Sequence, residues 1–440
     1  MVFKMLILVS PVKTTSVDLS SMVQVAGQTM KPNMLPAQKQ TVKSGAEYLQ
    51  SSRANVCQVS NRSPISCSES GKNLLLRYFK DLEYIASRVD FTKQKSDSFT
   101  WSCASYAAAA DQFVKSSDPQ LELTAVLYNI GVVCSSIGAH LLDDRSVESM
   151  RGGAKSLQLA AGFFRYCASY DVRSKNAGGN KVQGSSSLVT YGQLSDRFST
   201  DSLKVLEALM LANAQLIFHE LACSSVLASD SIAKVAAGVR DMFNLVVKKV
   251  GEMQRPADDI KSAAQLLASL FDAEAESRMA IFSKENFDVP SRLTHLANAL
   301  HIVYHARSKL LPQLRSTVSA TSGLALYDKS AFADAVAQKL AILDAELRKR
   351  HASAHEENSS VFHCTPAEHV PRVQPRISVK SMDPSDMIEG HAVDAKVLSA
   401  AALFVPLELS GAALAYSTKT SERSMASFQK LHQANAQLAE

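Results

Sequence analysis

The sequence predicts a mostly α-helical, elongated protein with a tetratricopeptide-like core of paired helices. Apolar residues recur at three- and four-residue steps in the long segments, for example over 232–250, which is the pattern of a helix with one buried face. Segments of 20 to 30 residues follow one another across short Ser/Asp-rich turns. Successive antiparallel helices of this kind are typical of helical repeat proteins, although no exact repeated motif is visible.

One strand and three helices are expected in the first 90 residues. The opening MVFKMLILVSPV is rich in Val, Ile and Leu and precedes a turn at 14–18. Because its apolar run is interrupted at Lys4 and ends near Pro11, it predicts a short N-terminal β-strand rather than a secretory signal. The segments SSMVQVAGQTM and QTVKSGAEYLQSSRANV are predicted helices, and LLLRYFKDLEYIASRV is a strongly amphipathic helix over about 74–89.

The stretch 121–142 is apolar nearly all round, which indicates a helix buried between neighbours. Its small residues, including Gly131 and Gly138, would let other helices come close. Another helix is expected over 154–170, followed by a polar surface loop over 171–200.

Five longer helices are predicted over about 201–227, 230–250, 257–286, 289–312 and 330–357. Beyond Ser359, Pro366, Pro371, Pro375 and Pro384 interrupt any helix, so an extended arm along the helical body is expected. A last helix is predicted near 422–440. We interpret the whole of 1–440 as a single domain, with a helical core over about 74–357 and the arm and last helix over about 358–440.

Composition excludes several classes of protein. The net charge of +5 is small for 440 residues, and the Lys and Arg residues are scattered, so no nucleic-acid partner is expected. Seven cysteines with no close pair of the metal-binding type suit a reducing compartment. No uninterrupted apolar run reaches the length of a membrane span.

The motifs of common enzymes are missing. The sequence has no phosphate-binding Gly-rich loop followed by Lys, no Gly-x-Ser-x-Gly and no His-Glu-x-x-His. Cys57 and Arg62 are separated by four residues, whereas a tyrosine phosphatase needs five. His351 and His355 lie one helical turn apart beside Glu356, which we interpret as a solvated helix end rather than a metal site. We therefore expect no catalytic residues, no cofactor, no metal and no small-molecule substrate.

Several segments are similar in sequence to a known protein family. ALMLANAQLIFHELA at 208–222, followed by SIAKVAA at 231–237, resembles BRO-one domains of the Alix and HD-PTP type. Further similar strings occur in family order, namely MLILVSPVKTTSVDL at 5–19, LLLRYFKDLEYIASRV at 74–89, FTW at 99–101, AVLYNIGVVCSSIGA at 125–139, AKSLQLAAGFF at 154–164 and FVPLELSGAALAY at 404–416.

The resemblance implies a boomerang-shaped helical domain that acts as a non-catalytic adaptor in endosomal sorting, the multivesicular body pathway. It implies binding to the C-terminal amphipathic helix of ESCRT-III subunits, and a cytoplasmic protein held peripherally on endosomal membranes.

Carried over by position, the family's apolar ESCRT-III patch falls on Phe218, Ser231 and Val235. Ser231 departs from the family pattern, where a large aliphatic residue is usual, and Ile232 is the candidate to replace it. Val235 also belongs to the apolar stripe of its own helix, so it has a packing role as an alternative.

Two other functions stay open from the sequence. One is a helical-repeat signalling scaffold with another client, of the Rho-pathway or pH-signalling type, which Ser231 makes more credible. The other is the non-catalytic N-terminal part of a longer phosphatase-like protein.

Overall fold

The computed structural model describes residues 6–8, 11–61, 68–91, 98–102, 113–170, 198–254, 256–317, 328–376 and 378–404, together with 406, 407, 409, 419, 420, 425 and 427. Within these residues the chain is mainly helical. In chain order the elements are α1 (Leu19–Met30), α2 (Pro36–Asn61), α3 (Glu69–Ala86), β1 (Phe99–Ser102), β2 (Phe113–Ser116), α4 (Pro119–Leu141), η3 (Leu142–Asp144), α5 (Val147–Ser169), α8 (Thr200–Cys223), α9 (Ser229–Gly251), α10 (Asp258–Glu285), α11 (Val289–His305), η5 (Ala306–Leu310), α12 (Leu311–Ser316), α13 (Lys329–Glu357), η6 (Asn358–Phe362), α14 (Ser385–Glu389) and α15 (Ala395–Ala401).

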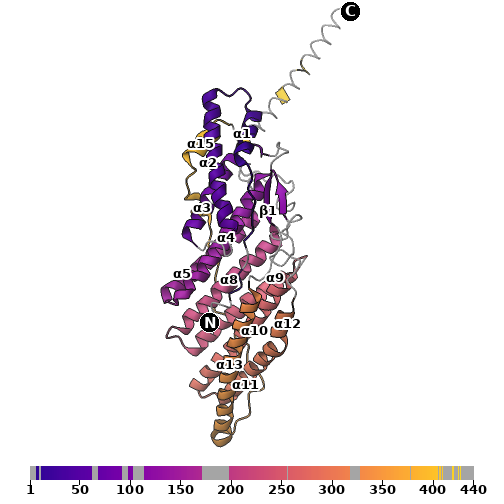
Figure 1. Ribbon diagram of the computed structural model, residues 1–440. Coiled ribbons are helices and arrows are strands. Elements are labelled where there is room, and N and C mark those ends of the chain that lie inside the picture. Colours follow the sequence, from indigo (N-terminus) through magenta and orange to yellow (C-terminus); the bar gives the residue numbers. More distant parts are fainter. Residues whose placement is uncertain are drawn as a thin grey trace, which may run out of the picture.

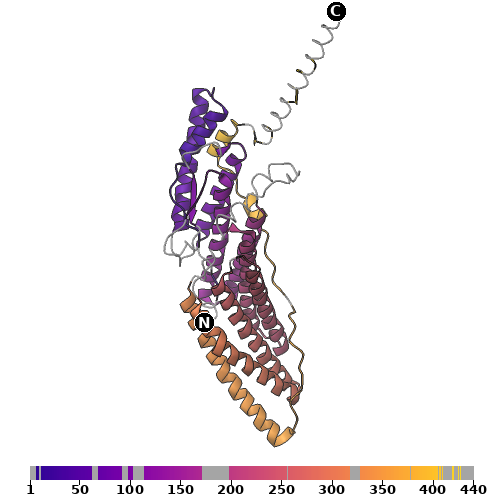
Figure 2. The ribbon, with the colours of Figure 1, turned by 90° about the vertical axis from the view of Figure 1, so that its right-hand side faces the viewer.

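The molecule is long and narrow, with neighbouring helices packed side by side along its length. Helices α1 to α3 occupy one end, α4, α5, α8 and α9 the middle, and α10 to α13 the other end (Figure 1). A quarter turn shows that the lower helices are inclined to the upper ones, which bends the body (Figure 2). The predicted elongated, boomerang-shaped helical fold is confirmed.

Polar side chains at the helix starts set where the helices begin. Asp118 accepts a hydrogen bond from the Gln120 amide (3.0 Å) at the start of α4, and Ser146 accepts one from the Ser149 amide (3.1 Å) at the start of α5. Such caps satisfy amide groups that have no partner within the helix. The cap at Ser146 explains why α5 begins seven residues before its predicted start at residue 154.

Glycines bring α4 and α5 together, as the sequence indicated. A Cβ atom on Gly131 would lie 3.0 Å from the Phe164 ring, and one on Gly138 would lie 3.0 Å from the carbonyl oxygen of Gly153. The absence of side chains at these positions therefore permits the close crossing that buries α4.

A buried polar group ties the first half of the body together. Glu122 of α4 accepts hydrogen bonds from Arg53 Nε (2.9 Å), Tyr78 Oη (2.9 Å) and Trp101 Nε1 (2.6 Å). An unpaired carboxylate would be costly to bury. The donors from α2, α3 and β1 offset the cost of burying Glu122.

Residues 6–8 and 11–12, the described part of the predicted N-terminal strand, do not form a strand. In the described residues, the sheet is the antiparallel pair of β1 and β2, and Thr14 adds one isolated bridge to Trp101. The N-terminal segment instead lies against helices. The side-chain amides of Asn213 and Asn129 pair with the backbone of Ile7 and Val12, through Nδ2 to carbonyl contacts of 2.9 Å in both cases. These buried amides satisfy an extended backbone without a neighbouring strand.

The expected C-terminal arm is present and runs back along the body (Figure 2). It forms hydrogen bonds in turn with α11, α9, α8, α5 and α3. The contacts join the Ala367 amide to Pro290 O (3.2 Å), Arg240 Nη2 to Val373 O (3.0 Å), the Val379 amide to Gln215 Oε1 (3.1 Å), the Met382 amide to Gln158 O (3.0 Å) and the Asp394 amide to Asp81 Oδ1 (2.8 Å).

Two short helices, α14 and α15, interrupt the arm, and α15 packs against α2. A Cβ on Gly45 would lie 2.6 Å from Ala400 Cβ, so this contact is close. The helices before residue 74 thus join the packed body. The predicted last helix over 422–440 and most of the polar loop over 171–200 lie outside the described residues, apart from 425 and 427 of the former and 198–200 of the latter.

Two helices in the described part of the chain, α4 and α8, are long and apolar enough on average to span a membrane by length and composition, although neither is an uninterrupted apolar run. Most of each helix is buried inside the body. Core helices of globular proteins meet the same criterion, so this is weak evidence for a span.

Candidate protein-binding groove

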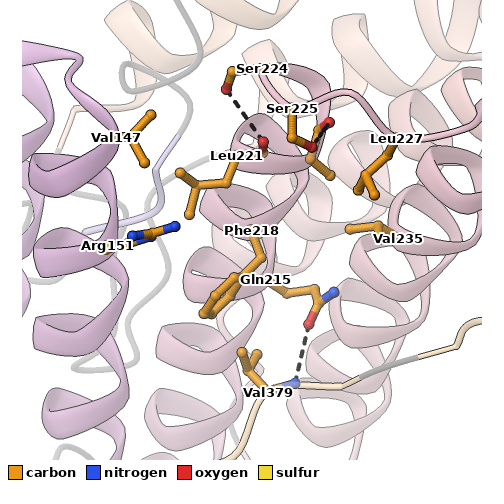
Figure 3. Close-up of a pocket in the computed structure, with 11 residues that line it drawn as sticks. Val147, Arg151, Gln215, Phe218, Leu221, Ser224, Ser225, Leu227, Val235 and Val379 are labelled. Atoms are coloured by element: carbon orange, nitrogen blue, oxygen red, sulfur yellow. Dashed lines mark hydrogen bonds between the residues drawn. The ribbon is translucent and has the colours of Figure 1, made fainter.

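A mostly apolar cavity of about 440 Å³ opens between α5, α8, α9 and the C-terminal arm (Figure 3). Its lining comes from segments that lie far apart in the sequence. The residues are Val147, Arg151, Gln215, Phe218, Leu221, Ala222, Ser224, Ser225, Leu227, Val235 and Val379. We call this the α8 groove.

Phe218 lies at the centre of the α8 groove. Its ring projects from α8 toward the arm, with Val379 beside it (Figure 3). The residue is 36% exposed, although the neighbouring Ile217 is fully buried. Val235 of α9 is half-buried and lines the opposite wall. The structure therefore brings together two of the four residues that the sequence nominated.

The other two nominated residues do not line the α8 groove. Ile232 is only 5% exposed, so the suggestion that it supplies the missing apolar group is wrong for this structure. One helical residue turns by about 100°, so Ile232 lies on a different side of α9 from its neighbour Ser231, and there it is buried. Ser231 is half-buried, and its hydroxyl donates to Asp230 Oδ1 at 3.3 Å.

Sequence reasoning missed several apolar residues of the α8 groove. Leu221 lies three residues after Phe218 on the same helix face, so helical spacing offered a signal for it. Leu227 and Val147 are 50% and 46% exposed, at the α8–α9 turn and the start of α5. Val379 has no sequence signal, because only the return path of the arm places it there.

Polar groups around the α8 groove are mostly engaged within the protein. Gln215 Oε1 accepts from the Val379 amide at 3.1 Å and so holds the arm at the groove edge (Figure 3). The hydroxyls of Ser224 and Ser225 donate to carbonyl oxygens of the preceding turn, at 2.7 and 2.8 Å. Arg151 lies on the α5 side and is exposed. This arrangement suits an apolar ligand surface with one anionic group near the rim.

A partly buried polar cluster joins α8 to α10. His219 approaches Cys223 Sγ at 3.6 Å, and Arg278 Nη2 of α10 approaches the same sulfur at 3.7 Å. Burial opposes a charge on His219, but hydrogen bonds to Cys223 and Glu220 outweigh it and raise its pKa to about 9. We interpret the cluster as a polar link between α8 and α10.

No group of three His, Cys, Asp or Glu side chains within the described part of the chain is arranged to hold a metal ion. The rings of His351 and His355 pack against each other, with their centroids 4.4 Å apart. Burial, followed by the neighbouring His355, lowers the pKa of His351. These two residues form an aromatic pair on α13.

The sequence matches the family model of the BRO1-like domain over residues 7–423. It is similar to the vacuolar protein-sorting protein bro-1 of Neurospora crassa, with 24% identity over 382 residues, 84% of this chain and 35% of that protein. It is also similar to programmed cell death 6-interacting protein of Xenopus laevis, with 24% identity over 250 residues, 56% of this chain and 27% of that protein. The matched part thus spans about a third or less of each relative.

Solved structures share the fold. A complex described as ALIX BRO1 with CHMP4C has a TM-score of 0.64 and 19% identity, and the match covers 86% of this chain and 95% of that one. ALIX in complex with a SIVmac239 late-domain peptide has a TM-score of 0.68 and 18% identity, covering 97% of this chain and 56% of that one. A structure titled as the basis for endosomal targeting by the Bro1 domain has a TM-score of 0.66 and 14% identity, covering 90% and 98%.

Proposed function

Because the chain belongs to the BRO1-like domain family, we propose that it is a non-catalytic adaptor of endosomal sorting. Its proposed partner is the C-terminal amphipathic helix of an ESCRT-III subunit, bound in the α8 groove. Its proposed location is the cytoplasm, peripherally on endosomes. The similarity to a protein named for vacuolar sorting supports the pathway, and the similarity to an ALIX domain solved with CHMP4C supports the partner.

The observation that carries the proposal is the exposed Phe218 in an apolar groove. An amphipathic helix binds such a groove through apolar side chains spaced one turn apart. Phe218 and Leu221 offer apolar positions on one face of α8, and Val235 adds one from α9. An aromatic side chain that is exposed in the free protein and central in a cavity is a typical binding hot spot.

Replacing Phe218 with Asp tests the proposal. The change removes the central apolar contact and places a charge where the partner's apolar side chains would lie. We expect a loss of about 2 kcal/mol or more, roughly thirtyfold in affinity, for a peptide spanning the C-terminal helix of CHMP4C. Isothermal titration calorimetry with the whole chain measures this loss. Because Ser231 does not line the groove, Ser231→Ile should leave the affinity unchanged.

The matched control is Tyr304→Asp. Tyr304 is an aromatic residue of α11 that is 67% exposed and does not line the α8 groove. Circular dichroism must show that both variants keep the wild-type helicity and melting temperature. If folded Phe218→Asp binds the peptide as tightly as Tyr304→Asp and wild type, the α8 groove is not the partner site.

Peripheral membrane attachment gives a separate prediction. A net charge of +5 over 440 residues gives only weak attraction to a generally anionic surface. Moderate salt, which screens charges beyond about 10 Å at 0.1 M, should therefore release the protein from phosphatidylserine vesicles. Sedimentation of vesicles over a salt series measures release. Binding that survives high salt and alkaline carbonate would contradict peripheral attachment.

A further inference from the structure

A second cavity, of about 500 Å³, lies between α10, α11 and α13, on elements that do not form the α8 groove. Its lining is strongly cationic. Lys284, Arg292, Lys349 and Arg350 face one carboxylate, Glu346, which leaves a net charge of +3 on the lining. Three separate helices contribute these cations, so the cavity concentrates charge that is scattered along the sequence. We call it the α13 basic cavity.

Arg292 is the most buried of these cations. Its side chain is 8% exposed, and one ion pair, from Nη1 to Glu357 Oε2 at 2.6 Å, is the contact recorded for it among the described residues. A guanidinium carries five N–H donors, which is more than this one ion pair uses, and Arg292 lines the cavity. Glu357 pairs with Arg292 without lining the cavity itself, so the described lining together with this partner still carries a net charge of +2.

The other cations divide into one that is held and two that are free to reach a ligand. Arg350 donates to Ser277 Oγ at 3.0 Å and to Glu346 Oε2 at 3.2 Å, so its guanidinium is fixed and Glu346 is neutralised. Lys284 and Lys349 are exposed, and no salt bridge within the described chain engages either ammonium group. Two exposed ammonium groups beside two guanidinium groups held by ion pairs are suited to phosphate oxygens.

We propose that the α13 basic cavity binds a phosphorylated inositol ring carrying two or more phosphates. A single carboxylate would neutralise only part of the lining charge, whereas several phosphates on one ring would neutralise all of it. Ala280, Ile281 and Leu296 supply an apolar wall for the ring carbons. None of the described lining residues is aromatic, so they offer no stacking surface of the kind that nucleotide binding ordinarily uses.

The ring can come from a soluble inositol phosphate or from a phosphoinositide headgroup, and the experiment separates them. Soluble inositol 1,4,5-trisphosphate is titrated into the whole chain by calorimetry. Sedimentation is then measured with vesicles containing phosphatidylinositol 4,5-bisphosphate, and with phosphatidylserine vesicles matched in total charge. Binding to the soluble ring alone identifies a soluble ligand. Binding to the ring and a preference for the phosphoinositide vesicles identify a headgroup site.

The test variant is Lys284→Ala/Lys349→Ala, and the control is Lys155→Ala/Lys248→Ala. All four lysines are exposed, and the control pair does not line the cavity, so both variants lose the same charge. We expect about tenfold weaker binding of the soluble trisphosphate in the test variant and less than twofold change in the control. Thermal melting checks that both remain folded.

Three results would overturn the proposal. The first is that the wild-type chain does not bind the soluble trisphosphate, and the second is that the two double variants bind it equally well. The third is that an acidic peptide without phosphate displaces the bound ring at equal concentration, which would identify a protein ligand instead. Peptide binding in the α8 groove is measured separately with Phe218→Asp, so failure of one site leaves the other proposal standing.

Discussion

Asp81 is a buried carboxylate on α3 where the C-terminal arm ends its path. Its Oδ1 accepts from the Asp394 amide at 2.8 Å, and its Oδ2 is buried with no hydrogen-bond partner among the described residues. Burial, with a further contribution from the nearby Asp394 charge, raises the pKa of Asp81 from 3.8 to about 6. The folded state therefore holds this proton more tightly than the unfolded chain does.

The raised pKa of Asp81 makes the free energy of unfolding decrease as the pH rises. The contribution of Asp81 is fully present below pH 4 and is lost as the pH rises through about 6. Asn in place of Asp cannot ionise and keeps an oxygen for the Asp394 amide. At pH 7 we expect Asp81→Asn to raise the free energy of unfolding by about 2 kcal/mol.

Urea denaturation of both proteins from pH 4 to pH 8 tests this expectation. The difference between the two curves should be small near pH 4 and grow to its full size near pH 7, because other titrating groups contribute equally to both. A constant difference across this range, or a less stable Asn variant at pH 7, would show that Asp81 is not destabilising as a charged group.

Individual residues show how far sequence could define the site. Phe218 was found through a resemblance in wording, and its exposure on α8 agrees with that choice. Ile232 was nominated because it is apolar and adjacent to the unexpected Ser231, but the turn of the helix directs it inward. Val379 could not be found, because its place beside Phe218 depends on a chain segment about 160 residues further along that packs back on the body.

At the scale of elements, the seat of the arm on α5 depends on one glycine. A Cβ atom on Gly162 would lie 1.7 Å from the Met382 carbonyl oxygen, which is far inside the contact distance. Gly162→Ala therefore requires the arm to move away. We expect a loss of about 1 to 3 kcal/mol in the free energy of unfolding. Faster hydrogen exchange of the Met382 amide should accompany it, because the amide donates to Gln158 O at 3.0 Å.

Gly251→Ala is the matched control. Among the described residues, and apart from its own chain neighbours and helix backbone, nothing lies within 4 Å of a Cβ built on Gly251 at the end of α9. Ala should be neutral or slightly stabilising there, by up to about 1 kcal/mol, since it restricts the unfolded chain more than Gly. Equal stability and equal exchange rates in the two variants would mean that the arm is not held through the contact at Gly162.

Elements were predictable where local signals decide them. Apolar periodicity placed α9 within one residue at each end, although its N-cap, Ala228, has no capping side chain, and α13 begins after the cap at Asp328, one residue before its predicted start. The N-terminal segment was assigned to a strand because its composition is that of a strand. Its actual partners are Asn129 and Asn213, which belong to distant helices and carry no local signal. Tertiary contacts therefore overrode composition there.

At the scale of the whole molecule, the return path of the arm joins parts that the chain order separates. The prolines after residue 359 predicted an extended segment but not its course, since hydrogen bonds to α11, α9, α8 and α5 guide it. Among its residues, Val379 also lines the α8 groove. The proposed partner site is therefore complete only when the arm is packed against α8.

A groove that includes the arm couples ligand binding to arm seating. A partner helix that contacts Val379 binds more tightly when the arm is packed on the body than when the arm is released. Binding must therefore stabilise the packed arm, and release of the arm must lower the affinity for the helix by the same factor. Saturating C-terminal CHMP4C peptide should slow hydrogen exchange of the Val379 and Met382 amides. Gly162→Ala should lower the affinity for the peptide by about three- to tenfold, because the arm is released in a fraction of the molecules and these bind the peptide less tightly. If the peptide binds in a way that Phe218→Asp weakens but exchange at both amides is unchanged, the peptide contacts α8 and α9 and not the arm.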